Sequence, residues 1–258
     1  MLLAFDVGNT TIAIGLFRGR KLVKSWKIET DSDKTSDEYG VLLLNLMQAA
    51  GLGAGKITGA IISSVVPPLT PVIEEVCATR LGTPAMVVGP GLKTGMPILY
   101  ETPLEVGADR ITASIAAFEK HGGPLIVLDF GTATTFDAVS AKGEYLGGAI
   151  APGVRISAEA LYLKTAKLPR IEIRKPKKAI GRTTVASMQS GLYFGYIGMV
   201  TRMIEEIRKE LGAGARVVAT GGFGGQLTAE LPAIEAYEPD LVLEGLRIIY
   251  ERNRDAGE

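Results

Sequence analysis

Near its N-terminus the sequence reads Leu2-Leu3-Ala4-Phe5-Asp6-Val7-Gly8-Asn9-Thr10-Thr11, an apolar segment that passes through an aspartate into a turn rich in glycine and threonine. The same pattern returns as Leu125-Ile126-Val127-Leu128-Asp129-Phe130-Gly131-Thr132-Ala133-Thr134-Thr135. Each copy predicts a buried strand that ends in a carboxylate beside a sharp turn. Because almost half of the chain separates the copies, they predict a duplicated fold with one such unit in each lobe.

Both turns are suited to bind phosphate. Gly8 and Gly131 let the backbone approach a ligand closely, and the N–H groups beside them can donate to phosphate oxygens. Asp6 and Asp129 follow buried strands and offer oxygens that suit Mg²⁺ or a monovalent cation. Further donors are the side chains of Asn9, Thr10, Thr11, Thr132, Thr134 and Thr135. Ordinary hairpin turns have the same composition, so the prediction of a nucleotide site between the lobes rests on the repeat.

Composition excludes several classes of protein. The 258 residues include 28 Lys and Arg and 28 Asp and Glu, so the formal net charge is zero and no basic stripe indicates nucleic-acid binding. One cysteine, Cys77, and one histidine, His121, cannot build a disulfide, a cysteine zinc site or a serine–histidine hydrolase. No apolar segment approaches the roughly 18 residues of a membrane span, and there is no signal-peptide profile, so we expect a cytoplasmic protein without membrane contact.

The remaining pattern alternates strands and helices. We expect strands over 2–5, 12–17, 22–28, 57–65, 85–88, 125–128, 136–140, 145–150 and 216–220, and helices over 36–51, 70–79, 108–120, 157–167, 188–211 and 241–252. Ser36 is expected to cap the first helix. Gly122-Gly123-Pro124 indicates the lobe boundary, which predicts an N-terminal domain over 1–121 and a C-terminal domain over 122–258.

Between the two turns, an Asp-Arg pair follows Gly107. A kinase needs a carboxylate near the acceptor hydroxyl, which Asp109 could supply, and a cation for charged oxygens, which Arg110 could supply. By itself the pair would sooner indicate a helix start with a surface arginine. The later cluster Gly221-Gly222-Phe223-Gly224-Gly225 could present bare backbone to an adenine ring or could be a plain loop.

Six motifs together resemble those of type III pantothenate kinases, in the family's order. They are Asp6-Val7-Gly8-Asn9-Thr10, Gly107-Ala108-Asp109-Arg110, Asp129-Phe130-Gly131-Thr132-Ala133-Thr134, Gly147-Gly148-Ala149-Ile150-Ala151-Pro152-Gly153, Ser187-Met188-Gln189-Ser190-Gly191 and Ala219-Thr220-Gly221-Gly222. The resemblance implies an α/β fold of two duplicated actin-like (ribonuclease H-like) lobes. Each lobe would hold a mixed five-stranded sheet flanked by helices, with the active site in the cleft between lobes. It implies ATP-dependent phosphorylation of the terminal primary hydroxyl of pantothenate to 4'-phosphopantothenate, the first step of coenzyme A biosynthesis.

Residue by residue, the resemblance implies that Asp109 is the catalytic base, that Asp6 lies near the Mg²⁺ of ATP, and that Asp129 binds a monovalent cation, K⁺ or NH₄⁺. The implied ATP-binding residues are Asp6, Val7, Gly8, Asn9, Thr10, Thr11, Ile12, Ala13 and Thr132. The implied pantothenate-binding residues are Tyr100, Gly107, Ala108, Asp109, Arg110 and Thr184. Thr184 would reach the pocket from a partner subunit, which implies a homodimer. Thr183 stands where the family usually has Asn, and we expect this difference to tune the pocket.

Two other functions are compatible with the phosphate-binding turns. A different small-molecule kinase of the same superfamily would explain the turns but not Tyr100 together with Gly107 to Arg110. A catalytically idle nucleotide-binding regulator would not need Asp6 and Asp109, and the sequence retains both.

Overall fold

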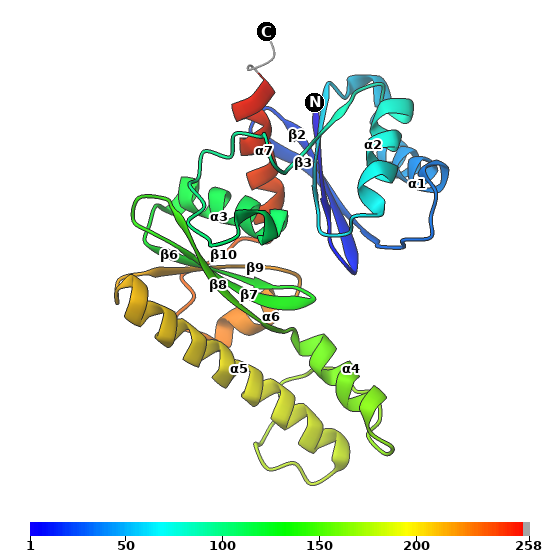
Figure 1. The fold of residues 1–258 in the computed structure, drawn as a ribbon. Helices are drawn as coiled ribbons and strands as arrows, with labels where there is room; N and C mark the ends of the chain where they lie inside the picture. The colour runs from blue at the N-terminus through cyan, green and yellow to red at the C-terminus, as the bar shows by residue number, and fades with distance from the viewer. Residues whose placement is uncertain (255–258) are drawn as a thin grey trace. The chain divides into compact units, whose positions relative to one another are not determined.

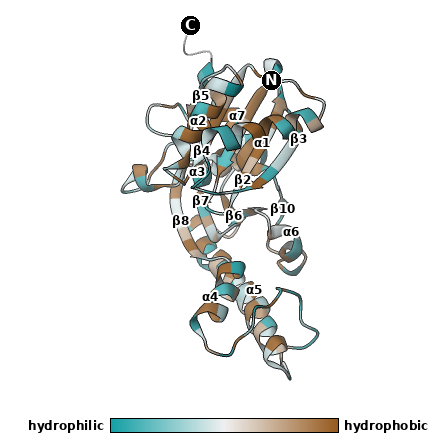
Figure 2. Cartoon of the chain, turned by 90° about the vertical axis from the view of Figure 1, so that its right-hand side faces the viewer, coloured by the Kyte–Doolittle hydropathy of each residue, from teal (hydrophilic) through white to brown (hydrophobic). Residues whose placement is uncertain are grey.

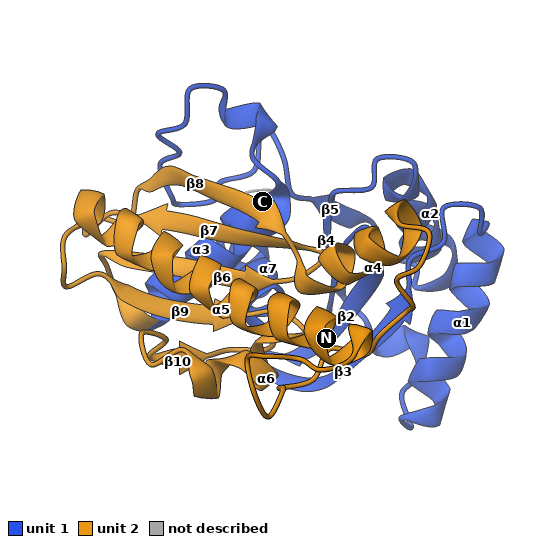
Figure 3. Ribbon diagram, turned by 90° about the horizontal axis from the view of Figure 1, so that it is seen from below, with its two compact units in different colours: residues 1–120, 240–258 blue, residues 121–239 orange. Residues whose placement is uncertain are grey.

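The computed structural model describes residues 1–254, which form two compact units (Figures 1 and 3). Within the described residues, unit 1 contains Met1–Lys120 and Asp240–Arg254, and unit 2 contains His121–Pro239. The last helix, α7 (Leu241–Arg254), therefore groups with the first unit, whereas the sequence suggested the second. Its Tyr250 fills the space above Gly59 and its Leu243 packs on Gly15, so apolar packing joins this helix to the N-terminal sheet.

Unit 1 is built on a five-stranded sheet in the order β3-β2-β1-β4-β5. Its strands are β1 (Leu2–Val7), β2 (Thr11–Arg18), β3 (Lys21–Glu29), β4 (Gly59–Ser64) and β5 (Ala85–Val87). The first three form an antiparallel meander, and β4 and β5 run parallel to β1. This sheet is mixed, as the sequence predicts.

Helices cover both faces of the sheet of unit 1. On one face, α1 (Ser36–Ala49) and α2 (Leu69–Arg80) pack their apolar side chains against Leu3, Phe5 and Val7. On the other face lies α7, and α3 (Ala108–His121) packs against it. The two helices are so close that a Cβ on Gly245 of α7 would lie 2.0 Å from the carbonyl oxygen of Thr112 in α3. Short 3-10 turns occupy Ala54–Lys56 and Pro103–Glu105.

Unit 2 repeats the topology of unit 1. Its sheet has the order β10-β9-β6-β7-β8, with β6 (Leu125–Phe130), β7 (Ala133–Val139), β8 (Tyr145–Pro152), β9 (Arg216–Thr220) and β10 (Ala236–Tyr237). Again the first three strands are antiparallel and the last two run parallel to the first. Strands β6 and β1 occupy equivalent central positions, so the duplication predicted from the two Asp-bearing segments is confirmed.

One face of the second sheet carries the helices of unit 2. The long α5 (Thr184–Leu211) runs along this face (Figure 1) and contributes Tyr193, Tyr196 and Val200 to an apolar cluster with Ile126 and Leu128. The other helices are α4 (Val154–Lys164), the single turn α6 (Gly224–Leu227) and a 3-10 turn over Thr228–Glu230. In Figure 2 the alternation of brown and teal along the helices shows their apolar and polar faces.

Several element boundaries differ from the sequence prediction. Thr35, not Ser36, caps α1, because the Thr35 hydroxyl accepts the Glu38 N–H while the Glu38 carboxylate accepts the Thr35 N–H, a capping box. Helix α5 begins at Thr184, four residues before the predicted start at Met188, and α4 begins at Val154, before the predicted Ser157. Within residues 1–254, none of the helices combines the length and apolarity that a membrane crossing requires.

Candidate active site

The first phosphate-type turn joins β1 to β2. Asp6 is the penultimate residue of β1 and is half-buried. Asn9, Thr10 and Thr11 are exposed at the turn. The turn is closed by a hydrogen bond from the Gly8 N–H to the Thr11 carbonyl at 3.1 Å. The Thr30 hydroxyl donates to the Gly8 carbonyl at 2.6 Å and fixes the turn from outside the hairpin. The side chains of Asn9, Thr10 and Thr11 lie on the exposed side of this closed turn.

Two of the predicted ATP-binding residues flank this turn with their side chains in the core. Val7 and Ile12 are both 0% exposed and pack in the apolar cluster between the sheet, α1 and α2. Only their backbone groups could contact a nucleotide. Their role in the fold is to anchor both ends of the turn, since a strand end with a buried side chain cannot slide relative to its neighbour.

The second turn, Gly131 and Thr132, joins β6 to β7 and is exposed. The segment after β8 supports it: the Gly153 N–H donates to the Thr132 carbonyl at 3.1 Å. A Cβ on Gly153 would lie 2.3 Å from this carbonyl oxygen, closer than real side chains approach. The glycine at position 153 is therefore required for the contact that holds the second turn.

The prediction that all threonines of the second turn serve as ligand donors is wrong for Thr134. Thr134 is fully buried and its hydroxyl hydrogen-bonds the phenol of Tyr196 on α5. Burial raises the pKa of that phenol to about 12. The Thr135 hydroxyl donates to a carboxylate oxygen of the buried Asp137 at 3.1 Å, and the Tyr145 phenol donates to the other oxygen at 2.7 Å. Strand alternation places Thr134 on the face of the sheet that α5 covers and the half-buried Thr135 on the opposite face.

The carboxylate of Asp129 is placed among glycines. A Cβ on Gly221, the residue that follows β9, would lie 2.3 Å from Asp129 Oδ1, and one on Gly131 would lie 3.5 Å from it. Gly221 has a φ of +90°, which glycine adopts without strain. The backbone of two glycines thus lies close to this carboxylate at the carboxyl end of β6, where oxygen donors can gather around a cation.

Asp109 is the second residue of α3, and its side chain folds back over the start of the helix. Its Oδ1 accepts the Arg110 N–H at 2.8 Å. A Cβ on Gly107 would lie only 2.5 Å from this oxygen, so the carboxylate occupies the space that a side chain at position 107 would need. Burial raises the pKa of the Asp109 carboxyl above its ordinary value, and the N–H and positive charge of Arg110 partly offset this rise. A carboxylate with a raised pKa is a better proton acceptor near neutral pH than an exposed one.

Asp109 and the first turn belong to the same end of the sheet of unit 1. The Val65 N–H, just beyond β4, donates to the Val7 carbonyl at 3.0 Å. A Cβ on Gly107 would lie 3.6 Å from Val65 Cγ1, so the segment before α3 rests on this same point. The structure therefore brings Asp6 and Asp109 to the carboxyl ends of β1 and β4. Tyr100 lies in the loop before α3, and 37% of its surface is exposed.

Thr184 is exposed at the first turn of α5. Thr183 caps this helix, because its hydroxyl accepts the Ala186 N–H at 3.2 Å. Threonine is among the residues preferred at helix N-caps. The Ser187 hydroxyl donates to the Gly181 carbonyl at 3.3 Å and the Ser190 hydroxyl to the Ala179 carbonyl, so the preceding loop is held against the helix.

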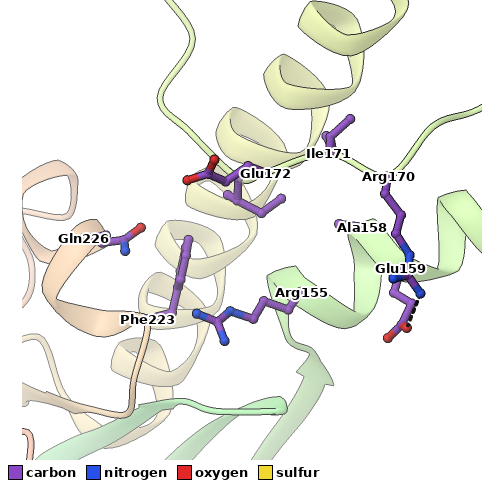
Figure 4. Close-up of a pocket in the computed structure, with 9 residues that line it drawn as sticks. Arg155, Ala158, Glu159, Arg170, Ile171, Glu172, Phe223 and Gln226 are labelled. Carbon is purple, nitrogen blue, oxygen red and sulfur yellow. Dashed lines mark ion pairs between the residues drawn. The ribbon is translucent and has the colours of Figure 1, made fainter.

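A pocket of about 370 Å³ in unit 2 contains residues that the sequence analysis did not assign (Figure 4). It is lined by Arg155, Ala158 and Glu159 of α4, by Arg170 to Ile173 of the following loop, by Phe223 within the glycine cluster and by Gln226 directly after that cluster. In Figure 4 the Arg155 guanidinium extends towards Phe223, and Glu159 pairs with Arg170 at 4.0 Å. Of these lining residues, only Phe223 belongs to a motif considered in the sequence, the glycine cluster 221–225.

No group of three or more His, Cys, Asp or Glu side chains within residues 1–254 is arranged to hold a metal ion. Mg²⁺ that arrives with a nucleotide is bound by one or two carboxylates together with substrate phosphates and water, and the half-buried Asp6 carboxylate has the chemistry for such a role.

Comparison with known proteins identifies the family. The family model described as type III pantothenate kinase matches residues 2–206. The type III pantothenate kinase of Moorella thermoacetica is 53% identical over 253 residues, which cover 98% of this chain and 100% of the relative. A Baf family protein of Campylobacter jejuni has a similar structure, with a TM-score of 0.63 and 18% identity over 98% of this chain and 99% of its own.

The same fold occurs in component A of the Acidaminococcus fermentans (R)-2-hydroxyglutaryl-CoA dehydratase, with a TM-score of 0.55 and 14% identity over 100% of this chain and 99% of the other. At this identity the likeness concerns the fold alone. The family match covers both Asp-bearing turns and the Asp109 segment, and the sequence identity extends over nearly the whole chain. This chain belongs to the type III pantothenate kinase family, which phosphorylates pantothenate in coenzyme A biosynthesis.

Proposed function

We propose that Asp109 is the base of the phosphoryl transfer. The acceptor hydroxyl of pantothenate forms the new bond to the γ-phosphorus of ATP, the bond from this phosphorus to the bridging oxygen of ADP breaks, and the hydroxyl proton passes to the Asp109 carboxylate. The observation that carries this proposal is the half-buried carboxylate at the start of α3, seated against Gly107 with a raised pKa. Arg110 would neutralise a carboxylate or phosphate oxygen of the reactants.

The phosphate groups of ATP would be bound by the exposed residues of the two turns, Asn9 to Thr11 in the first and Thr132 in the second. Asp6 would face Mg²⁺, which supplies charge neutralisation on the β- and γ-phosphates when it is bound. Tyr100, Gly107, Ala108 and Arg110 would line the site for pantothenate. The cytoplasm, where ATP is the common phosphoryl donor, is the proposed location of the reaction.

Asp129 would bind a monovalent cation, K⁺ or NH₄⁺. The support for this proposal is the glycine-lined environment of its Oδ1, where a Cβ on Gly221 would intrude. A large, weakly hydrated cation needs several oxygen ligands at once, and backbone carbonyls can approach where no side chain intervenes. The role of Asp129 would be to hold positive charge close to the phosphates.

A homodimer would complete the pantothenate site through Thr184. Apolar side chains exposed on α4, α5 and the loop between them support this proposal, since such a surface is typical of an interface. They are Ile156, Tyr162, Leu163, Ile180, Val185 and Phe194, with between 37% and 84% of their surface exposed.

A mixed dimer tests both the shared site and the role of Asp109. Asp109→Asn and Thr184→Arg are each expected to inactivate the homodimer. If Thr184 acts across the subunit boundary, a purified heterodimer of the two variants contains one site with neither substitution, and about half of the wild-type activity returns. A heterodimer without activity, or a monomeric wild-type enzyme in analytical ultracentrifugation, would contradict the shared site.

The pocket beside Phe223 would receive the base of ATP, because its aromatic ring offers a stacking surface and Arg155 lies opposite. Phe223→Leu keeps an apolar side chain in the core but removes the ring. The KM for ATP is expected to rise about tenfold from the lost stacking. The KM for pantothenate in the same variant is the control and should not change. An unchanged KM for ATP would show that the base binds elsewhere.

A further inference from the structure

Ser63 lies beside Asp6 on the neighbouring strand. Asp6 of β1 is the direct partner of Ser63 of β4 in the parallel register. The residues before them, Phe5 and Ile62, both belong to the apolar cluster under α1 and α2. Because side chains alternate along a strand, Asp6 and Ser63 lie together on the opposite face of the sheet. Adjacent strands are about 4.8 Å apart, a span that a serine hydroxyl and an aspartate carboxylate can bridge with a hydrogen bond.

The Ser63 hydroxyl is fully buried and makes no hydrogen bond within the described residues. Its neighbour Ser64 differs, because the Ser64 hydroxyl donates to the Val66 carbonyl and accepts the Val66 N–H, each at 3.2 Å. A buried hydroxyl without a partner lowers stability relative to an alanine in the same place. Packing alone therefore gives no reason for serine at position 63.

We propose that Ser63 is a positioning residue for Asp6. When Asp6 turns towards the Mg²⁺ of bound ATP, the Ser63 hydroxyl donates a hydrogen bond to the carboxylate oxygen that faces away from the ion. The hydrogen bond fixes the orientation of the carboxylate, as groups behind metal-binding side chains commonly do. The inference rests on the proposed role of Asp6, and it gives a reason for a serine hydroxyl at this buried position.

Ser114 provides a matched control. It is also a fully buried serine of unit 1 whose hydroxyl makes no hydrogen bond within the described residues, but it lies in the middle of α3. Ser63→Ala and Ser114→Ala remove the same atom from equally buried places. Both should leave the melting temperature of the ligand-free protein unchanged or higher.

The experiment is a thermal-shift titration of each variant with Mg²⁺ at fixed ATP, with steady-state kinetics in parallel. For Ser63→Ala, the Mg²⁺ concentration that gives half of the stabilisation should rise about tenfold, and the KM for pantothenate should not change. Ser63→Cys, whose thiol is a weak donor of similar size, should behave in the same way. Ser114→Ala should match the wild type. Equal Mg²⁺ dependence for the Ser63 and Ser114 variants would overturn the inference.

Asp6→Asn separates this inference from its premise. Loss of Mg²⁺-dependent stabilisation in Asp6→Asn together with wild-type behaviour of Ser63→Ala would refute the role of Ser63 alone. Wild-type Mg²⁺ dependence in Asp6→Asn would refute the proposed role of Asp6, and the inference about Ser63 with it.

Discussion

Asp109→Asn is expected to lower kcat for pantothenate phosphorylation by about 10²- to 10⁴-fold while the protein stays at least as stable as the wild type. The amide cannot accept the proton, but its oxygen can still accept the Arg110 N–H that Asp109 Oδ1 accepts at 2.8 Å. The fold around the residue should therefore be preserved. Steady-state kinetics and thermal denaturation measure the two effects separately.

The direction of the stability change follows from the pKa. Burial raises the pKa of Asp109 in the folded state, so the folded protein binds this proton more tightly than the unfolded chain does. The stability that this group contributes is present at low pH and is lost as the pH rises through the unfolded pKa towards the folded one. At neutral pH the charged carboxylate therefore costs stability, and asparagine removes that cost. In the wild type, the acidic limb of kcat/KM should lie above the ordinary pKa of aspartate.

Asp37→Asn is the matched control. Asp37 is also the second residue of a helix, α1, but it is on the surface and pairs with Arg80. Its substitution should leave kcat unchanged and lower stability slightly, because the helix N-terminus and the ion pair both favour the charge. If Asp109→Asn kept more than a tenth of the wild-type kcat, another group would have to accept the proton.

Gly221→Ala is expected to disrupt the second unit at the Asp129 carboxylate. Alanine at a φ of +90° is strained, and its Cβ would lie 2.3 Å from Asp129 Oδ1 and 2.6 Å from the backbone of Phe130. The free energy of unfolding should fall by about 2 kcal/mol or more. Since the carboxylate must move to relieve the contact, activity should fall about 10²-fold even below the melting temperature.

Gly222→Ala tests whether this effect is specific. Gly222 is the next residue, yet a Cβ there has no atom within 4 Å and its φ is not positive. The variant should retain wild-type stability and kcat. Equal losses in both variants would mean that the loop tolerates no side chain at all. Wild-type behaviour of Gly221→Ala would mean that Asp129 is not confined as the structure describes.

The duplicated fold could be predicted because its determinants are local. An apolar run that ends in Asp and a Gly/Thr turn specifies a strand and its end within ten residues, and the two copies became the equivalent strands β1 and β6. The unit to which the last helix belongs could not be predicted. Helix α7 joins unit 1 because Tyr250 packs on Gly59 and Leu243 packs on Gly15, and these pairs are far apart in the sequence.

The candidate site shows the same limit. Asp109 and Asp6 could be proposed as site residues from their motifs, but the burial of Thr134 and its bond to Tyr196 depend on α5, which follows much later in the chain. The need for glycine at positions 153 and 221 is visible only in the structure. A Cβ on Gly153 would clash with the second turn, and a Cβ on Gly221 would clash with the Asp129 carboxylate. The pocket lined by Arg155 and Arg170 is formed by three separate segments, and only the segment with Phe223 contains a motif.

The most direct test of the account is the release of ADP from Mg²⁺-ATP by the wild-type enzyme, with and without pantothenate and with and without K⁺. We predict ADP release that requires pantothenate, is raised by K⁺ and disappears in Asp109→Asn. ADP release that requires a different hydroxyl compound would contradict the acceptor, and no release with any acceptor would contradict catalysis by this site.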